Sequence, residues 1–317
     1  MYNFFFGGKG GARIFCAICF DAIFTKAKSD RYYCMENIPI RSLTNKEPEL
    51  VGSFSIRSTD ELLTEQAVVQ ELHRHDFFFL LTLEKAKGSH EIDFIPYEVC
   101  DHSLYFMRPG QVHQNTLQAS GGGYLMQFTQ DFYVPSDKLS QQRLRQASYQ
   151  NFYKLEKAPF QRIFGQLTHI FQEYSHQQAG YLEVIKSALN ILFIELVRQN
   201  QPTTKDSANA YQQEKLEELQ ELLTDHITQH KQVGYYAEQL HLSAYQLNAI
   251  TKTTLGKTCS ELINEQIILE AKRYLLATSN QVNQIAWHLG YEDPSYFIRF
   301  FKKHMGASPE AFRKNFK

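Results

Sequence analysis

The sequence predicts an α+β multidomain chain, in which an N-terminal β-barrel with following helices precedes a C-terminal all-α domain. Short aromatic and β-branched runs, separated by glycine and proline turns, fill the first half of the chain. Apolar residues recur at helical spacing from residue 141 onward. The last third holds two helix-turn-helix patterns joined by a long linker helix.

Length and charge set the first limits on function. A chain of 317 residues favours two domains, and a composition of 43% hydrophobic and 21% charged residues can build ordinary cores. The net charge of −1 excludes a protein that binds nucleic acid through bulk positive charge alone. Residues 231–317 nevertheless hold eleven lysines and arginines against seven acidic residues. That local surplus suits a domain that contacts DNA phosphates.

Residues 1–34 are interpreted as an N-terminal extension with no functional role, because Met35 and the residues after it look like a natural start. The Phe- and Gly-rich stretch before Met35 fits neither a signal peptide nor a phosphate loop. Five unpatterned cysteines favour a reducing cytoplasm, and no apolar run predicts a membrane span. The cysteines are Cys16, Cys19, Cys34, Cys100 and Cys259.

Residues 35–140 are predicted to form the barrel, or a double-sheet jelly roll. Aromatic and β-branched runs predict four of its strands. They are Phe77–Leu83, Glu91–Ile95, Leu104–Met107 and Tyr124–Phe128. Turn signals separate them at residues 87–89, 101–103, 109–110 and 121–123. Such folds can hold a small ligand.

Three histidines point to the interior of this barrel. His73 and His75 share one face of a strand, and His113 follows a Pro-Gly turn. These segments resemble the two signature segments of the cupin fold, in which such histidines can bind a divalent metal. The carboxylate of that pattern is missing, so we expect neither a metal nor another cofactor, although the three histidines could hold zinc or iron. The predicted ligand pocket comprises His73, His75, Phe77, Phe79, Tyr105 and His113.

Helical periodicity replaces the strands at residues 141–200. Apolar positions three and four residues apart predict two amphipathic helices, one from Phe160 to Phe171 and one from Ile185 to Val197. Their apolar faces either pack on the barrel or pair two chains as a dimer seam. Residues 201–210 are polar and are predicted to link this half to a C-terminal domain at residues 211–317.

Two copies of one pattern define the C-terminal domain. The first, Val233-x-x-x-Ala237-x-x-Leu240, recurs 49 residues later from Val282 to Leu289. Each copy predicts a short helix, a tight turn and a second helix, which is the layout that places a helix in the DNA major groove. One such pattern is often only a pair of packed helices, whereas two tandem copies favour a sequence-specific DNA binder.

In the first unit, Ser243 is the predicted N-cap of a second helix over Ala244–Leu255. A capping box at Thr258 and Glu261 opens the linker helix, which runs to about Ala277. At 1.5 Å per residue this helix is about 27–30 Å long, near the ~34 Å of one DNA turn. The outward residues predicted to contact DNA here are Tyr245, Gln246, Asn248, Ala249 and Lys252.

In the second unit, Asp293 is the predicted N-cap of the reading helix, Pro294 occupies its first turn and Gly306 ends it. Three phenylalanines are predicted to face the core, and Arg299 suits bidentate contact with guanine. The phenylalanines are Phe297, Phe300 and Phe301. The outward residues predicted to contact DNA are Ser295, Ile298, Arg299, Lys302 and Lys303.

Roughly the last hundred residues resemble the AraC/XylS family of transcription regulators. The resemblance lies in Ile285-Ala286-x-x-Leu289-Gly290-Tyr291, Ser295-Tyr296-Phe297-x-Arg299-x-Phe301-Lys302-Lys303 and Gly306-x-Ser308-Pro309. It implies a cupin-like sensor domain, and base edges nearest Tyr245, Asn248, Ala249, Ser295, Ile298 and Arg299. Many relatives carry arginine at the position of Ala249. We therefore expect the first unit to read bases weakly, or to use Asn248 towards adenine and Ala249 towards a thymine methyl.

These observations predict a cytoplasmic transcription regulator, an activator rather than an enzyme, whose barrel senses a small-molecule effector. Its expected partners are double-stranded promoter DNA, RNA polymerase and a second copy of the chain, with no membrane. Two alternatives remain open. One is a metal-dependent cupin enzyme with a DNA-binding tail. The other is a ligand-independent regulator whose barrel only dimerises.

Overall fold

The computed structural model describes residues 40–41, 53–62, 68–119, 121–135, 137–200 and 207–316. The predicted extension at residues 1–34 lies outside the described residues, as do residues 201–206 of the predicted linker. Among the described helices, none combines the length and the apolar character needed to cross a bilayer.

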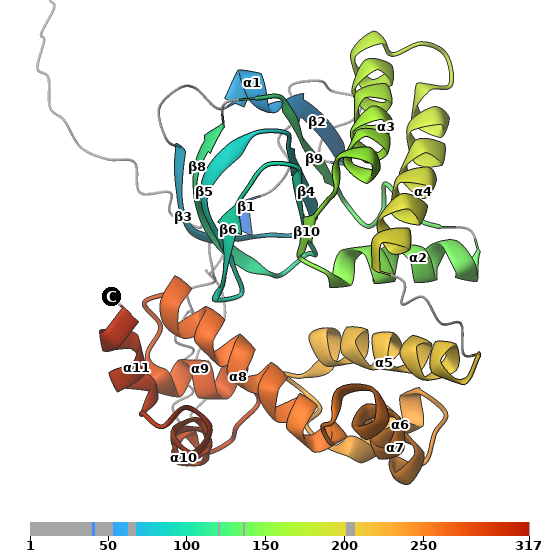
Figure 1. Ribbon diagram of the computed structural model, residues 1–317. Helices are drawn as coiled ribbons and strands as arrows, with labels where there is room; N and C mark the ends of the chain where they lie inside the picture. Colours follow the sequence, from blue (N-terminus) through green and yellow to red (C-terminus); the bar gives the residue numbers. More distant parts are fainter. Residues whose placement is uncertain are drawn as a thin grey trace, which may run out of the picture. The chain divides into compact units, whose positions relative to one another are not determined.

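Two five-stranded sheets face each other in the N-terminal domain (Figure 1). The first contains, in spatial order, β1 (Ile40–Arg41), β3 (Val68–His75), β8 (Val112–Ala119), β5 (Ala86–Ile92) and β6 (Ile95–Val99). The second contains β10 (Phe152–Lys154), β7 (Ser103–Met107), β4 (Phe78–Leu83), β9 (Gly123–Phe128) and β2 (Phe54–Ser58), and helix α1 (Thr59–Leu62) follows β2. No ladder joins the sheets within the described residues, so the predicted barrel is an open jelly-roll-like pair, called here the double sheet.

The second sheet is buried on both faces, which explains its uninterrupted apolar runs. Every residue of β4 and of β7 is buried. Successive side chains of a strand alternate between faces. Phe79 and Leu81 therefore point into the core between the sheets, whereas Phe78 and Leu80 point to the helices behind.

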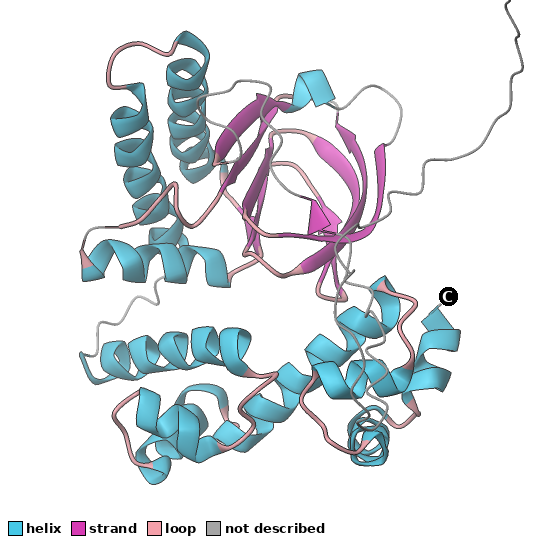
Figure 2. Ribbon diagram, turned by 180° about the vertical axis from the view of Figure 1, so that it is seen from behind, coloured by secondary structure: helices cyan, strands magenta, loops and turns pink. Residues whose placement is uncertain are grey.

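Three helices cover the outer face of the second sheet (Figure 2). They are α2 (Lys138–Tyr149), α3 (Lys157–His176) and α4 (Tyr181–Asn200). The predicted apolar faces of α3 and α4 pack into this core, where Ile163, Leu167, Leu189 and Phe193 are fully buried. These faces are therefore occupied within the chain, which is the first of the two expected roles. Strand β10 interrupts the predicted helical segment because it pairs with β7.

The strand predicted at residues 91–95 is wrong. These residues span the tight turn between β5 and β6, where Asp93 and Phe94 have φ angles of 49° and 67°. The turn predicted at residues 87–89 lies inside β5 instead. A Cβ on Gly88 would lie 2.0 Å from the carbonyl oxygen of Thr116 on β8, and its φ is +138°. Glycine is needed there because the two strands approach each other closely. In the sequence, the same glycine resembles a turn signal.

Seven helices form the C-terminal domain. They are α5 (Ser207–His226), α6 (Val233–Gln239), α7 (Ala244–Leu255), α8 (Cys259–Ala277), α9 (Val282–His288), α10 (Pro294–Met305) and α11 (Pro309–Phe316). Helix α5 begins inside the predicted linker. The predicted caps at Ser243, Thr258 and Asp293 are confirmed, because each side chain accepts a backbone N–H bond in the first turn that follows. Each unit has its own core, and α8 contributes to both.

Replacing Gly88 with alanine is expected to lower the free energy of unfolding by at least about 2 kcal/mol, because the added Cβ collides with a strand backbone. The matched control is Gly165→Ala on α3, where nothing lies within 4 Å of a new Cβ. The control should gain up to about 1 kcal/mol, the helix preference of alanine over glycine. Urea unfolding measures both changes, and an unchanged midpoint for Gly88→Ala would contradict the strand contact.

Candidate DNA-reading helices and sensor interior

The ten residues predicted to contact DNA lie on two helices, five on α7 and five on α10. On α7, Tyr245 is 84% exposed, and Gln246, Ala249 and Lys252 are also exposed. Leu247 on the opposite face is fully buried in the core of the first unit. Helix α7 therefore exposes one face to solvent and uses the other to hold its position.

Two side chains of α7 that are predicted to contact DNA also hold the fold together. Asn248 Nδ2 donates to the Ala244 carbonyl oxygen at 3.0 Å, and Asn248 Oδ1 accepts from the backbone N–H of Cys259 at 3.0 Å. Gln246 Oε1 accepts from the backbone N–H of Ser243 at 2.8 Å. Each amide has two N–H donors and two oxygen lone pairs, so these internal bonds use part of its hydrogen-bonding capacity and restrain its orientation. The expected contact of Asn248 with adenine must therefore be made from an orientation that also attaches α7 to α8.

The exposed face of α10 is more basic. It presents Ser295, Ile298, Arg299, Lys302 and Lys303, all exposed. The Arg299 guanidinium carbon lies 4.6 Å from the ring centroid of Tyr296, which is itself 64% exposed. Asp293 accepts the backbone N–H of Ser295 at 2.8 Å, and its hydrogen bonds to Ser295, together with the nearby Arg299 cation, lower the pKa of this carboxyl. The helix cap therefore stays ionised at neutral pH.

The two units touch at the turn that follows α9. Gly290 has a φ of 72°, and a Cβ on it would lie 2.1 Å from the carbonyl oxygen of Thr228. Lys231 Nζ donates to the Gly290 carbonyl oxygen at 3.4 Å and lies 5.2 Å from the ring centroid of Tyr291. Gly290 therefore allows the close contact between the first unit and the second.

Inside the double sheet, the three predicted histidines meet a fourth. Nε2 of His113 lies 2.9 Å from Nε2 of His75 and 3.0 Å from Nε2 of His73. Nδ1 of His113 lies 2.9 Å from Nε2 of His90. Burial, and then the nearby charge of His73, lowers the pKa of His90 to about 3, so this ring is neutral. Sequence reasoning missed His90 because residues 87–89 resemble a turn and hide strand β5.

The remaining predicted pocket residues join the same cluster. The His75 ring lies 4.4 Å from that of Phe77 and 5.3 Å from that of Phe79, and the Tyr105 ring lies 4.8 Å from that of His90. Each of these side chains is at most 5% exposed. The structure therefore brings all six predicted pocket residues together, packed ring against ring in the core between the sheets.

The histidine geometry fits a three-nitrogen metal site. The ligand nitrogens of the three histidines all lie within 4.8 Å of one another. The two separations to His113 Nε2 are 2.9 and 3.0 Å, shorter than the roughly 3.3 Å between nitrogens of a tetrahedral site with bonds of about 2.05 Å, so a tetrahedral ion would require the rings to separate by a few tenths of an ångström. His73 Nδ1 lies 2.6 Å from the carbonyl oxygen of Glu71, so this nitrogen carries the proton and Nε2 offers a lone pair. A single proton on His113 Nε2 cannot lie between it and both neighbours in linear hydrogen bonds, whereas a cation can contact all three nitrogens.

Comparison with known proteins identifies the C-terminal domain. The family described as "Helix-turn-helix domain" matches residues 236–315. The chain is 23% identical over 256 residues to the HTH-type transcriptional activator RhaS of Pectobacterium atrosepticum, covering 76% of this chain and 86% of that one. It is 24% identical over 249 residues to the HTH-type transcriptional activator RhaR of an Enterobacter species, with coverage of 76% and 86%. The helix-turn-helix match and these relatives support DNA-binding transcription regulation of the AraC type.

Two solved structures show further similarity to this chain. The C-terminal domain of the two-component response regulator yesN from Fusobacterium nucleatum is 29% identical, with a TM-score of 0.29, and the match covers 31% of this chain and 95% of that chain. The unsaturated fatty acid bound form of ToxT from Vibrio cholerae is 15% identical, with a TM-score of 0.36, and the match covers 86% of this chain and 97% of that chain.

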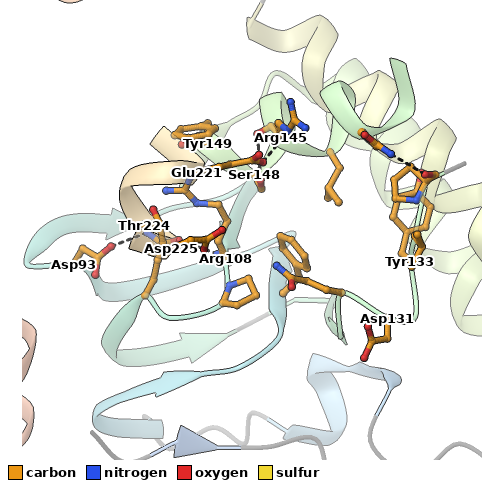
Figure 3. A pocket seen from close by; sticks show the side chains of 18 of the residues that line it. Asp93, Arg108, Asp131, Tyr133, Arg145, Ser148, Tyr149, Glu221, Thr224 and Asp225 are labelled. Atoms are coloured by element: carbon orange, nitrogen blue, oxygen red, sulfur yellow. Dashed lines mark hydrogen bonds and ion pairs between the residues drawn. The ribbon is translucent and has the colours of Figure 1, made fainter. Parts of the chain in front are cut away.

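A cavity of about 510 Å³ lies outside the predicted pocket, and residues of the double sheet, α2, α5 and α8 line it (Figure 3). The Arg108 guanidinium lies 4.0 Å from the ring centroid of Tyr149, and Arg145 pairs with Glu221 at 2.8 Å. None of the six predicted pocket residues lines this cavity. Its lining comes from segments far apart in the chain, so no local sequence pattern could have indicated it.

Replacing Arg299 with alanine is expected to cost about 1–3 kcal/mol of DNA binding and to relax preference at one base position, the loss typical of one good base contact. Lys303→Ala is the matched control on the same helix. It should weaken binding uniformly and reduce the salt dependence by about one counterion, because lysine contacts phosphates. Affinities for duplexes with single base changes measure both effects. A uniform loss for Arg299→Ala would instead assign this arginine to the phosphates.

Replacing Tyr296 tests whether its ring positions Arg299. Tyr296→Ala is expected to weaken binding by about 0.5–1 kcal/mol, the size of an exposed cation–π contact, and to reduce preference at the base that Arg299 reads. Tyr296→Phe keeps the ring and should behave as the wild type in the same measurements. Equal losses in the two variants would show that the hydroxyl group, and not the ring, makes the contribution.

Proposed function

We propose that this chain is a cytoplasmic transcription activator that reads promoter DNA with α7 and α10 and responds to a small molecule bound by its N-terminal domain. The observation that carries the proposal is the pair of exposed helices, each held by its own core and joined by α8. With 19 residues, α8 is about 28 Å long, comparable to the ~34 Å of one DNA turn. This length supports entry of the two helices into successive major grooves on one face of a duplex.

The two helices are proposed to contribute unequally. Arg299 on α10 is exposed and carried on a tyrosine ring, which favours direct reading of a guanine. On α7 the amides of Gln246 and Asn248 are used internally, and Ala249 offers only a methyl group. The first helix is therefore proposed to supply mainly contacts that position the protein on the duplex.

The remaining partners are proposed on weaker grounds. The relatives RhaS and RhaR are described as transcriptional activators, which supports contact of this chain with RNA polymerase. A second copy of the chain would double the number of reading helices on the promoter. Two apolar side chains of α4, Val184 and Ile191, are 36% and 47% exposed and would suit such a dimer contact.

Selection of bound duplexes from a random DNA pool by the full-length protein tests the DNA-reading function. The expected result is a site with two unequal halves about one helical turn apart, the stronger half containing a guanine that Arg299→Ala no longer selects. Recovery of unselected sequence, or of one half-site only, would contradict the proposed reading by two helices.

A second candidate function is favoured by the histidine geometry, namely binding of zinc or iron between the sheets. His73, His75 and His113 would be the ligands, and His90 would orient His113 from behind. The bound metal would supply Lewis acidity or a metal-dependent response. Within this site, His90 keeps a neutral ring against His113, and the surrounding aromatic side chains exclude water from the histidines.

Metal analysis of the purified protein separates the two candidates. If the site binds metal, the wild type should hold about one zinc or iron per chain after dialysis, since three histidines suffice for a zinc site. His73→Ala should lose it, whereas the exposed control His176→Ala on α3 should retain it. Substoichiometric metal in all three proteins would remove the metal-dependent candidate and leave the pocket to a different ligand.

The ligand-independent alternative is tested by thermal unfolding with candidate effectors. A compound that binds only the folded domain must raise the unfolding midpoint, by mass action. A compound that also changes affinity for the selected duplex establishes the sensor. If no compound of a broad metabolite panel shifts the midpoint, the double sheet is an interaction module instead.

A further inference from the structure

We propose that the ion pair between Asp93 and Arg273 is a latch that holds the DNA-binding domain against the double sheet and lowers its affinity for DNA. Asp93 lies in the β5–β6 turn, and Arg273 lies on α8. The two residues are 180 positions apart in the chain. The inference rests on the proposed function, because it assigns a regulatory contact to the two helices that read DNA.

The pair is bidentate and buried. Arg273 Nε donates to Asp93 Oδ1 at 2.8 Å, and Nη2 donates to Asp93 Oδ2 at 2.8 Å. The side chains are only 6% and 9% exposed. Arg273 Nη1 also donates to Glu270 on its own helix at 2.8 Å. Two parallel charge-assisted bonds give the pair a defined geometry, and removal of one partner leaves a buried charge with fewer contacts.

Asp93 is tied directly to the strand that carries His113. Its Oδ2 accepts from Gln111 Nε2 at 2.8 Å, and its Oδ1 accepts from the backbone N–H of Val112 at 3.2 Å. The Asp93 backbone N–H donates to the Val112 carbonyl oxygen at 2.9 Å. His113 is the next residue and points into the sensor interior. A shift of residues 111–113 on ligand binding therefore moves the carboxylate that Arg273 holds.

Both reading units are attached to the N-terminal domain. Beside the first unit, Lys138 and Arg145 of α2 pair with Glu214 and Glu221 of α5 at 2.7 and 2.8 Å, and Figure 3 shows the second of these pairs. Beside the second unit, apolar side chains of the double sheet pack with the core that α8 shares. These side chains are Leu72, Phe94 and Val112.

The direction of the effect follows from charge and from restraint. The docked arrangement places Arg273 against a carboxylate and Lys272 Nζ 4.7 Å from the ring centroid of Phe94, so two cations of α8 are engaged by the double sheet. It also ties each unit to one body, so the two reading helices cannot adjust separately to successive grooves. Release of the latch frees positive charge and allows that adjustment, and both changes favour DNA binding.

The cavity gives a ligand access to the latch. Asp93, Gln111 and Arg273 all belong to its lining, and Figure 3 labels Asp93 there. A polar molecule bound there would contact the pair directly, whereas a ligand between the sheets would act through His113 and Val112. Either route ends at the same carboxylate.

The test compares full-length Asp93→Asn with the control Asp131→Asn. Asparagine keeps the shape of aspartate and tolerates the positive φ of residue 93. Asp131 is exposed and lines the same cavity, so each variant removes one negative charge from the same domain. Asp93→Asn is expected to bind the selected duplex about tenfold more tightly, a common size for coupling between sites. The control should stay within about twofold of the wild type.

Small-angle X-ray scattering without DNA gives an independent measurement of docking. The radius of gyration of Asp93→Asn should exceed those of the wild type and the control. Arg273→Lys keeps the cation but loses the bidentate bond, and it replaces Asp93→Asn in the test if that variant folds poorly. It should also bind the selected duplex more tightly than the wild type. Unchanged or weakened binding by Asp93→Asn, beside a wild type that binds, overturns the latch alone. A wild type that selects no duplex overturns the DNA-reading function, and unchanged scattering would then overturn the latch as well.

Discussion

Helix α8 supplies buried side chains to the cores of both reading units and to the contact with the double sheet. The placement of both reading helices depends on it. Ile263 and Ile267 lie in the core of the first unit, and Tyr274 and Leu275 lie in the core of the second. A helix that is apolar around most of its circumference is stable only when other elements surround it. The two cores therefore form together with α8, and its length sets the separation between α7 and α10.

The two units differ in which side chains hold them together. Asn248 attaches α7 to the first residue of α8 through a hydrogen bond to Cys259, so the first unit uses a polar side chain for cohesion. At the junction with α10, contact is made by Gly290, Lys231 and Tyr291 instead. The face of α10 is thereby left to exposed Arg299. Asn248 therefore stabilises the first unit, whereas Arg299 of the second unit stays available for a base.

The contact between the N-terminal domain and the reading units combines ion pairs with the apolar packing of Leu72, Phe94 and Val112. Arg273, Arg145 and Lys138 each meet a carboxylate across it. Apolar cores are non-directional and tolerate small movements, whereas bidentate ion pairs depend on position and lose their bonds when an atom moves by an ångström or so. Polar contacts between domains resemble transient interfaces. A boundary of this kind suits a protein whose two halves must exchange information.

The sequence by itself determined the reading units and their boundaries. Ser243, Thr258, Asp293 and Gly306 each act on backbone groups within four residues, so their signals are local and appear in any fold. The histidine pairing of His73 with His75 was equally local, since it follows from strand alternation. The packing of α3 and α4 on the sheet, however, could not be separated from a dimer seam, because an apolar face does not name the surface that covers it.

Only the tertiary structure decided what lies at long range. It brought His90 to His113, because β5 pairs with β8. In the sequence, Gly88 makes strand β5 resemble a turn. It also brought Asp93 to Arg273 across 180 positions. Each of these residues is ordinary in its local context, and its partner is selected by the way sheets and helices stack. The sequence therefore predicted the two helices that are proposed to meet DNA, and the packing of distant segments decided which contacts join them to the double sheet.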